Sequence, residues 1–185
     1  MSEPVNQERK TEAPVDRLFV ERRSLRAFSD DPVEAGQIAT LFEAARWSPS
    51  CYNEQPWLFV YGVSSGDRER MLALLAEGNR AWAADAPVLG VVFARRHFAR
   101  NGKPNRWAAF DSGAASLALA LQAHKLGLFA HFMGGFDKHR AHEELGISSE
   151  THEAMAAFVV GHPGDLAEHG EPTGRKPLAE VAVTP

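Results

Sequence analysis

Residues 88–94 constrain the fold of this chain more than any other segment. They follow Pro87 and are apolar at almost every position. A strand with one face in water alternates apolar and polar side chains, so an unbroken apolar run indicates a strand covered on both faces. We therefore expect residues 88–94 to form the buried central strand of a layered fold.

Helical and strand-like patterns surround this central run. Helical patterns occupy residues 16–22, 38–45, 71–78, 107–126 and 138–145. Strand-like runs occupy residues 57–63, 129–133 and 156–161. Asp16 is the expected cap of the first helix, Pro49 ends the second, the third fades around Gly78, and Gly127 is the left-handed stop of the longest. Helices outnumber strands and segregate unevenly from them, which indicates an α+β sandwich.

Length and composition favour one soluble domain. The 185 residues can bury a sizeable core, and the net charge of −4 gives no global field that favours nucleic acid. The single cysteine, Cys51, cannot form a disulfide within the chain, which fits a reducing compartment. No apolar stretch has the length of a membrane span or of a signal peptide, so we expect a cytoplasmic protein.

We expect a flexible lead-in over residues 1–14 and a single domain over residues 15–185. Its tail, residues 172–185, is expected to dock on its own sheet or on another subunit.

A cluster of fixed cations lies near the start of the domain. It comprises Arg22, Arg23 and Arg26, with the hydroxyl of Ser24 among them. Arginine suits phosphate because its planar fork donates parallel hydrogen bonds and keeps its charge. The alternative is a solvated helix end, where the same arginines offset the helix dipole. Taken alone, the cluster favours the alternative.

A polar turn at residues 48–57 follows one predicted helix later. Pro49 and Pro56 restrict its backbone and lower the entropy cost of a shaped turn. Asn53 offers both a donor and an acceptor, as a flat ring with a polar edge requires, and Gln55 either does the same or braces the loop. The alternative is a helix-stop loop whose amides satisfy local backbone groups.

Both segments, in this order, resemble the nitroreductase family of flavin enzymes. That family typically opens with Arg-Arg-Ser-x-Arg and continues to Pro-Ser-x-x-Asn-x-Gln-Pro-Trp. The likeness extends over residues 22–183. It implies a three-layer α+β sandwich with a central, mainly antiparallel sheet flanked by helices, in an intertwined homodimer with flavin mononucleotide (FMN) at the interface.

The resemblance also implies roles for individual residues. In the family pattern Arg22, Ser24 and Arg26 contact the flavin, and Arg23 is less certain. The turn contributes Pro49, Ser50, Cys51 and Asn53, of which residues 49–51 come from the partner subunit. A backbone N–H of Gly134 or Gly135 lies near flavin N5, with Met133 beside them. Near the C-terminus, Arg175 and then Lys176 are the expected basic pair that closes on the phosphate.

The family chemistry is a two-step hydride exchange. NADH or NADPH reduces the flavin and leaves, and a small acceptor such as a nitroaromatic or a quinone takes its place. No side chain has to act as a general base, so no catalytic residue is assigned. The chain lacks the Gly-x-Gly-x-x-Gly fingerprint, so a nicotinamide would not have a domain of its own.

Two alternatives to this oxidoreductase stay open. One is a flavin-sequestering or redox-sensing module that binds flavin without turnover. Another is a thiol-dependent hydrolase centred on Cys51, although no histidine lies within ten residues of it. The spacing of His139, His142 and Glu143 is a weak metal signal, so no metal site is assigned. We also expect Arg22→Ala to weaken flavin retention more than Arg9→Ala in the lead-in.

Overall fold

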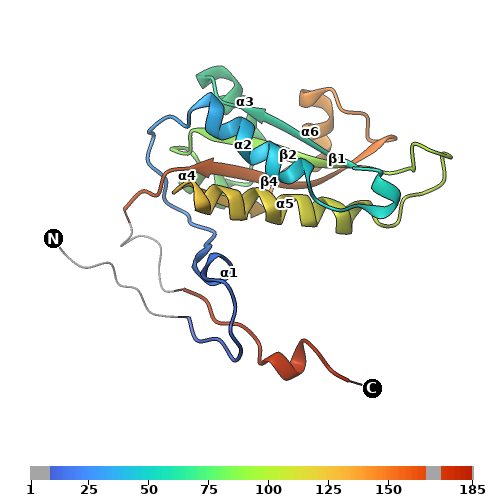
Figure 1. Ribbon diagram of the computed structural model, residues 1–185. Helices are drawn as coiled ribbons and strands as arrows, with labels where there is room; N and C mark the ends of the chain where they lie inside the picture. The colour runs from blue at the N-terminus through green and yellow to red at the C-terminus, as the bar shows by residue number, and fades with distance from the viewer. Residues whose placement is uncertain (1–8, 166–171, 185) are drawn as a thin grey trace.

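A four-stranded antiparallel sheet forms the middle layer of the protein (Figure 1). The computed structural model describes residues 9–165 and 172–184. The strands lie in the order β1-β2-β4-β3. Their bounds are β1 (Trp57–Gly62), β2 (Val88–Arg95), β3 (Phe129–Met133) and β4 (His152–Gly161). β1 and β3 are therefore the two edges of the sheet.

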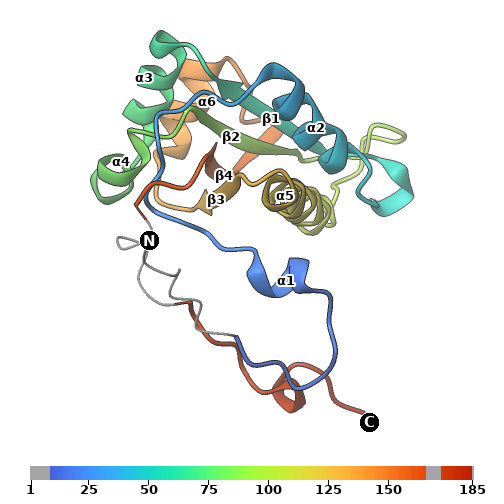
Figure 2. The same cartoon turned by 60° about the vertical axis from the view of Figure 1, so that its left-hand side comes forward.

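Helices cover both faces of the sheet, as Figure 2 shows. One face packs against α2 (Ala35–Arg46) and α5 (Ala108–Lys125). The other packs against α3 (Ser65–Leu74), α4 (Glu77–Ala83) and α6 (Lys138–Leu145). Each face has its own hydrophobic cluster. The expected three-layer α+β sandwich is confirmed.

β2 is the buried central strand that its apolar run predicts. Its first seven residues are buried, and they alternate between the two hydrophobic clusters. Leu89, Val91 and Phe93 pack under α3, α4 and α6. Val88 and Val92 pack under α2 and α5. Because both faces are covered, neither set of side chains needs to be polar.

α5 packs on the sheet with its small side chains and turns large ones outward. Ala115, Ala120 and Ala123 are buried against α2 and the sheet. Phe110 is 73% exposed and Leu117 is 48% exposed on the opposite side of the helix. The slim face permits close packing, and it leaves a strip of large apolar side chains uncovered in the single chain.

The bounds of two elements differ from the sequence expectation. The helix expected at residues 71–78 is wrong at both ends, because α3 begins at Ser65 and stops at Leu74, and Leu75 is extended. A separate helix, α4, follows, and Gly78 lies inside it. β4 begins at His152, four residues before the expected start at Ala156. Gly127 adopts a φ of 73° after α5, as predicted for a left-handed stop.

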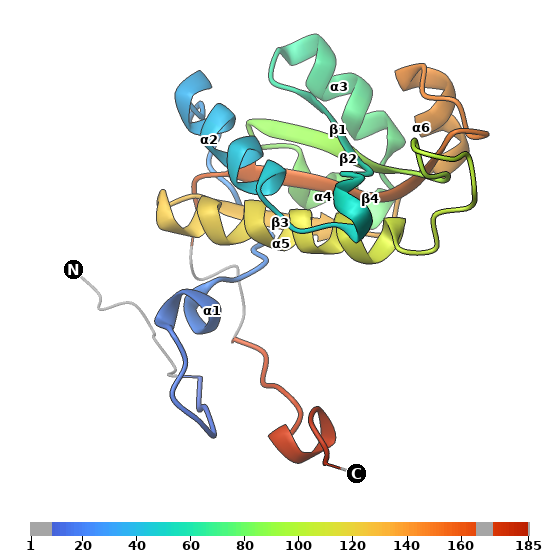
Figure 3. The same ribbon diagram turned by 45° about the vertical axis from the view of Figure 1, so that its right-hand side comes forward.

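The described parts of both terminal segments extend away from the sandwich, as Figures 1 and 3 show. The N-terminal arm contains α1 (Arg17–Glu21), capped by Asp16, and Glu21 lies 3.7 Å from His124 near the end of α5. The C-terminal segment contains a 3-10 turn, η3 (Leu178–Glu180), whose first backbone N–H donates to Glu12. Residues 1–8 of the expected lead-in and residues 166–171 and 185 lie outside the described chain. The expectations for the lead-in and the tail stay predictions.

Candidate functional site

Arginines from both ends of the chain meet beside the C-terminal end of α5. Arg22 follows α1 directly, and its guanidinium lies 3.4 Å from the hydroxyl of Ser24. Arg9 reaches across the arm and donates to the carbonyls of Val20 at 2.7 Å and of Arg22 at 3.0 Å. Arg175 comes from the C-terminal segment and is close enough to act electrostatically on both Arg9 and Arg22.

This cluster is electrostatically unfavourable by itself. Burial, and then the positive charge of Arg175, lower the pKa of Arg22. Burial and the charges of Arg175, Arg22 and Arg23 lower the pKa of Arg9. Arginines keep their charge at neutral pH, so the repulsion persists until an anion offsets it. Arg9 is therefore a member of the cluster, and the expected difference between Arg22→Ala and Arg9→Ala in flavin retention stays a prediction.

Aromatic rings line the edge strand next to the cluster. The imidazole of His131 on β3 stacks on Trp82 of α4, with ring centroids 4.6 Å apart. Its Nδ1 donates to the carbonyl of Leu25 at 2.7 Å, which ties β3 to the arginine segment. Burial lowers the pKa of His131, and the charges of Arg26 and Arg22 lower it further. The ring is therefore neutral at pH 7, with Nδ1 protonated.

The loop after β3 is held by Asn79. Its side-chain amide donates to the carbonyl of Gly135 at 2.9 Å, and the backbone N–H of Ala76 donates to the same oxygen. A Cβ on Gly135 would lie 2.5 Å from that amide, whereas a Cβ on Gly134 would meet nothing within 4 Å. The side chain of Met133 points into the core. Sequence reasoning missed Asn79 because the contact joins residues 56 positions apart.

The turn at residues 49–55 is braced from within and from α5. The hydroxyl of Ser50 accepts from the backbone of Gln55, and the amide of Gln55 donates to the carbonyl of Asn53. Gln55 therefore braces the loop. The carboxylate of Asp111, in the first turn of α5, accepts from the backbone N–H of Cys51 at 3.0 Å. This turn contains η1 (Cys51–Asn53), which lies beside the N-terminal end of α5 (Figure 3).

The turn also carries backbone strain. Tyr52, Asn53 and Gln55 have φ values of 54°, 58° and 47°. Residues other than glycine and asparagine rarely adopt this left-handed backbone conformation. Such strain persists where the surrounding structure holds the backbone in place. The side chain of Asn53 is exposed.

Two halves of the predicted site lie at opposite edges of one sheet. The turn at residues 49–55 leads into β1, and the loop with Gly134 and Gly135 follows β3. Three inter-strand spacings separate these edges, roughly 14 Å. The arginine cluster lies with β3, near His124 at one end of α5, and the turn lies at the other end. The single chain therefore ties the arginine segment to β3, the strand that leads into the glycine loop, and holds the turn at the opposite edge of the sheet.

The other predicted residues have local partners or solvent. The Nζ of Lys176 lies 3.9 Å from the carboxylate of Glu180. The thiol of Cys51 makes no hydrogen bond within residues 9–165 and 172–184, and the residue is partly buried. His139 pairs with Glu143, and His142 contacts the carbonyl of Ile147. In the described chain, no three His, Cys, Asp or Glu residues are grouped as metal ligands, and no helix could cross a bilayer.

Comparisons with known proteins identify the family. The model of the nitroreductase family matches residues 19–81 and 62–162. This chain belongs to the nitroreductase family. A Thermus thermophilus protein named NADH dehydrogenase is 33% identical over 89% of this chain and 92% of its own length. A Streptomyces coelicolor protein, provisionally named an NADH dehydrogenase/NAD(P)H nitroreductase, is 31% identical over 79% of this chain and 81% of its own.

Solved structures share the fold closely. A crystal structure described as an oxidoreductase containing FMN is 42% identical, covers 96% of both chains and has a TM-score of 0.89. A nitroreductase-family protein from Streptococcus pneumoniae has a TM-score of 0.77 at 22% identity, over 91% of this chain and 98% of its own, which shows the fold alone.

Proposed function

We propose that this protein is an FMN-dependent oxidoreductase that takes hydride from NADH or NADPH and reduces a small acceptor, such as a nitroaromatic or a quinone, in two separate half-reactions. The observation that carries the proposal is the meeting of Arg22 and Arg175 beside Arg9. A solved relative at 42% identity is described as containing FMN, and two curated relatives carry NADH dehydrogenase or nitroreductase names. The identity of the acceptor is a separate part of this proposal.

The residues of the cluster fit the phosphate of FMN. A phosphate monoester is close to a dianion at neutral pH, since its second pKa is about 6. Burial and then the charge of Arg175 lower the pKa of Arg22, and such an anion would offset the repulsion from Arg175. The guanidiniums of Arg22 and Arg175 would each donate to it, with the hydroxyl of Ser24 beside them. Arg26 and Arg23 add positive charge around that position.

The flavin ring would lie along the β3 edge towards Gly134 and Gly135. The amide of Asn79 and the backbone of the glycine loop would face the polar edge of the ring, because they already form one hydrogen-bonded unit. Trp82 and His131 would border it as a stacked aromatic wall. When bound, FMN supplies the hydride-accepting and electron-donating chemistry, so the chain itself binds, orients and excludes water.

The second wall of the site would come from another copy of the chain. Pro49, Ser50 and Cys51 lie at the sheet edge opposite to the glycine loop, so they cannot cover a ring bound by that loop in the same protomer. A homodimer with two-fold symmetry would bring the turn of one protomer to the glycine loop of its partner. The uncovered strip on α5, with Phe110 and Leu117, supports such an interface.

Flavin binding and bleaching test this function. Apoprotein titrated with FMN is expected to bind it, and NADH or NADPH under anaerobic conditions is expected to bleach the flavin. Arg22→Ala should weaken FMN binding roughly tenfold or more, because it removes charge-assisted hydrogen bonds. Lys138→Ala, on the exposed surface of α6, is the matched control and should bind normally.

The outcomes separate the alternatives. Bleaching followed by reoxidation with a nitroaromatic or a quinone supports the oxidoreductase. Flavin that binds but resists both nicotinamides would instead support a flavin-sequestering module. Equal FMN affinity in Arg22→Ala and Lys138→Ala would contradict the phosphate assignment.

A further inference from the structure

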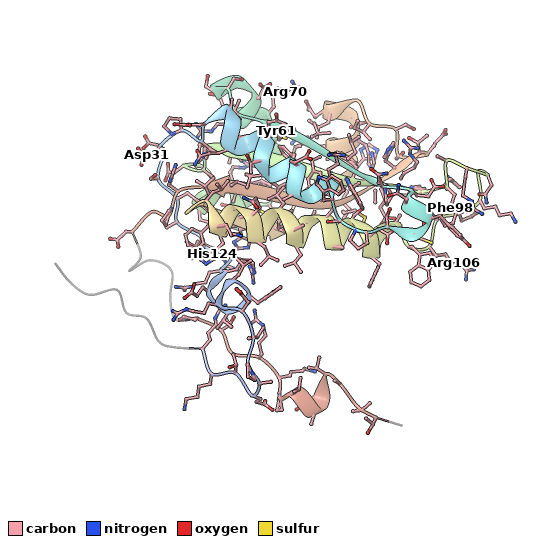
Figure 4. The ribbon with its side chains drawn as sticks, viewed as in Figure 1. Asp31, Tyr61, Arg70, Phe98, Arg106 and His124 are labelled. Carbon is pink, nitrogen blue, oxygen red and sulfur yellow. The ribbon has the colours of Figure 1, made fainter. Side chains whose placement is uncertain are left out.

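Residues 95–106 form a strongly basic segment in an acidic chain. These twelve residues contain no Asp or Glu and five fixed cations, namely Arg95, Arg96, Arg100, Lys103 and Arg106. The whole chain has a formal charge of −4, so the remainder carries −4 − 5 = −9. Arg95 ends β2, and the rest of the segment forms the loop between β2 and α5. Figure 4 places Phe98 and Arg106 at the end of the molecule opposite to His124.

A cavity of about 240 Å³ opens between this loop and the first turn of α5. Asn105 lines it and is only 7% exposed. Its side-chain carbonyl accepts from the backbone of Trp107 at 3.1 Å. Its amide nitrogen has no hydrogen-bond partner within residues 9–165 and 172–184. A buried donor without an acceptor is costly, so it marks a position that suits an acceptor from outside the chain.

The other groups around the cavity also offer donors. Arg106 lines it, and its guanidinium makes no hydrogen bond or ion pair with the described residues. Ala108 and Ala109 contribute the N-terminal turn of α5, an eighteen-residue helix without a side-chain cap on its first residue. Such a terminus carries partial positive charge, and although the N–H of Ala108 donates to the carbonyl of Asn105, the next N–H groups have no carbonyl earlier in the helix to bind. These groups together suit an oxyanion.

Arg96 has a structural role at the same cavity. Its guanidinium donates to the carbonyls of Ser149 and His152, and it lies 3.3 Å from the carboxylate of Glu153. Glu153 also lines the cavity, and Arg96 balances its charge. The donors available to a ligand are therefore those of Asn105, Arg106 and the helix terminus.

This cavity is separate from the arginine cluster of the proposed FMN phosphate site. That cluster lies near the C-terminal end of α5, whereas the cavity lies at its N-terminal end. Eighteen residues at 1.5 Å each separate them by roughly 27 Å. One phosphate cannot contact both in one protomer.

The basic loop and the turn at residues 49–55 form one unit. A carboxylate oxygen of Glu54 accepts from the backbone N–H of Ala99 at 2.7 Å. The guanidinium of Arg100 lies over the ring of Tyr52 at 3.9 Å. Under the proposed function this turn covers the flavin of the partner, so the basic loop would stand at the rim of that site. A nicotinamide dinucleotide stacked on the open flavin face must extend its diphosphate past the rim.

We propose that the cavity formed by Asn105, Arg106 and the N-terminal turn of α5 binds the diphosphate of the nicotinamide dinucleotide donor. This inference rests on the proposed function for the identity of the donor. The oxyanion chemistry of the cavity stands on the contacts of Asn105 and Arg106 themselves.

Two substitutions remove the donors with little change in shape. Asn105→Asp keeps the oxygen that accepts from Trp107 and replaces the orphaned amide with a repelling carboxylate oxygen. Arg106→Gln neutralises an exposed side chain and is expected to fold normally. Lys138→Gln removes one positive charge elsewhere and is the matched control. Thermal melting of each FMN-loaded variant verifies folding, and Arg106→Gln preserves the test if Asn105→Asp is unstable.

The first readout does not depend on activity. Pyrophosphate titrated into the wild-type protein and followed by phosphorus NMR is expected to bind, and to bind roughly tenfold more weakly to Asn105→Asp and Arg106→Gln. Equal binding to all four proteins, or no binding to wild type, would overturn the proposal.

The second readout uses two donors under anaerobic conditions. NADH carries the diphosphate, whereas reduced nicotinamide riboside carries none. The concentration of NADH that half-saturates flavin reduction should rise roughly tenfold in both variants, and that of the riboside should stay unchanged. An equal change for both donors, or none for NADH, would contradict the proposal. Failure of every donor to bleach wild-type flavin would reject the proposed function instead, and the pyrophosphate titration would still decide the chemistry of the cavity.

Discussion

Neighbouring glycines in the loop after β3 differ sharply in what a side chain would meet. We expect Gly135→Ala to lower the free energy of unfolding by about 1–2 kcal/mol, because the new Cβ displaces the amide of Asn79 from the carbonyl that it binds. Gly134→Ala meets open space and should change stability by no more than about 0.5 kcal/mol. Urea denaturation of both variants measures the difference, and equal destabilisation would refute the assignment.

His131 gives the fold a specific pH dependence. Burial and two arginines lower its pKa in the folded state, whereas the unfolded residue titrates near the ordinary value of about 6.5. The unfolded chain therefore takes up this proton first as pH falls, and stability that is present above about pH 6.5 is lost below it. His131→Asn retains a donor for the carbonyl of Leu25 but cannot titrate.

The measurement is the melting temperature at pH 7.5 and at pH 5.5. We expect wild type to lose more stability between these values than His131→Asn does. The pKa of His152 is also lowered by burial, so some loss is common to both proteins and the difference reports His131 alone. Parallel losses in the two proteins would show that His131 contributes nothing to the pH dependence.

The break between α3 and α4 shows where an element depends on distant contacts. Residues 74–77 are Leu, Leu, Ala and Glu, all good helix formers, so no local signal ends the helix there. The break coincides with contacts from elsewhere in the chain. The guanidinium of Arg80 donates to the carbonyls of Leu72 and Leu75, and Ala76 donates to Gly135. The sequence therefore predicted helix in this region but not its interruption.

A further prediction concerns the contact between two elements, η1 and α5. Asp111 is buried in the first turn of α5, where the helix dipole favours its charge, and it accepts from the backbone of Cys51. Asp111→Ala leaves that N–H without a partner, so we expect a loss of about 1–3 kcal/mol in the free energy of unfolding. Asp111→Asn retains an acceptor oxygen and should lose less. An equal loss in the two variants would exclude the hydrogen bond as the cause.

For the molecule as a whole, the three layers could be predicted from the sequence. Of the candidate site, only some residues could be predicted in this way. The apolar run of β2 and the Gly127 stop determine elements locally, so periodicity found them. The meeting of Arg9 with Arg175 joins the two ends of the chain, and no local pattern encodes that contact. Motif resemblance supplied Arg22 and Arg175 but not Arg9 or Asn79.

The strip on α5 bears on the proposed homodimer. Phe110 and Leu117 are large, apolar and exposed, and the terminal segments add Val181 at 71% and Val183 at 83% exposed. A two-fold interface would bring copies of one strip together, so Phe110→Glu with Leu117→Glu would set like charges against each other. We expect the double variant to be monomeric by light scattering and to retain less FMN, because the turn with Cys51 would no longer reach its partner's flavin. Val63→Glu, at another exposed apolar position, is the control and should remain dimeric. A double variant that stays dimeric, or a wild-type monomer that holds FMN, would refute the shared site.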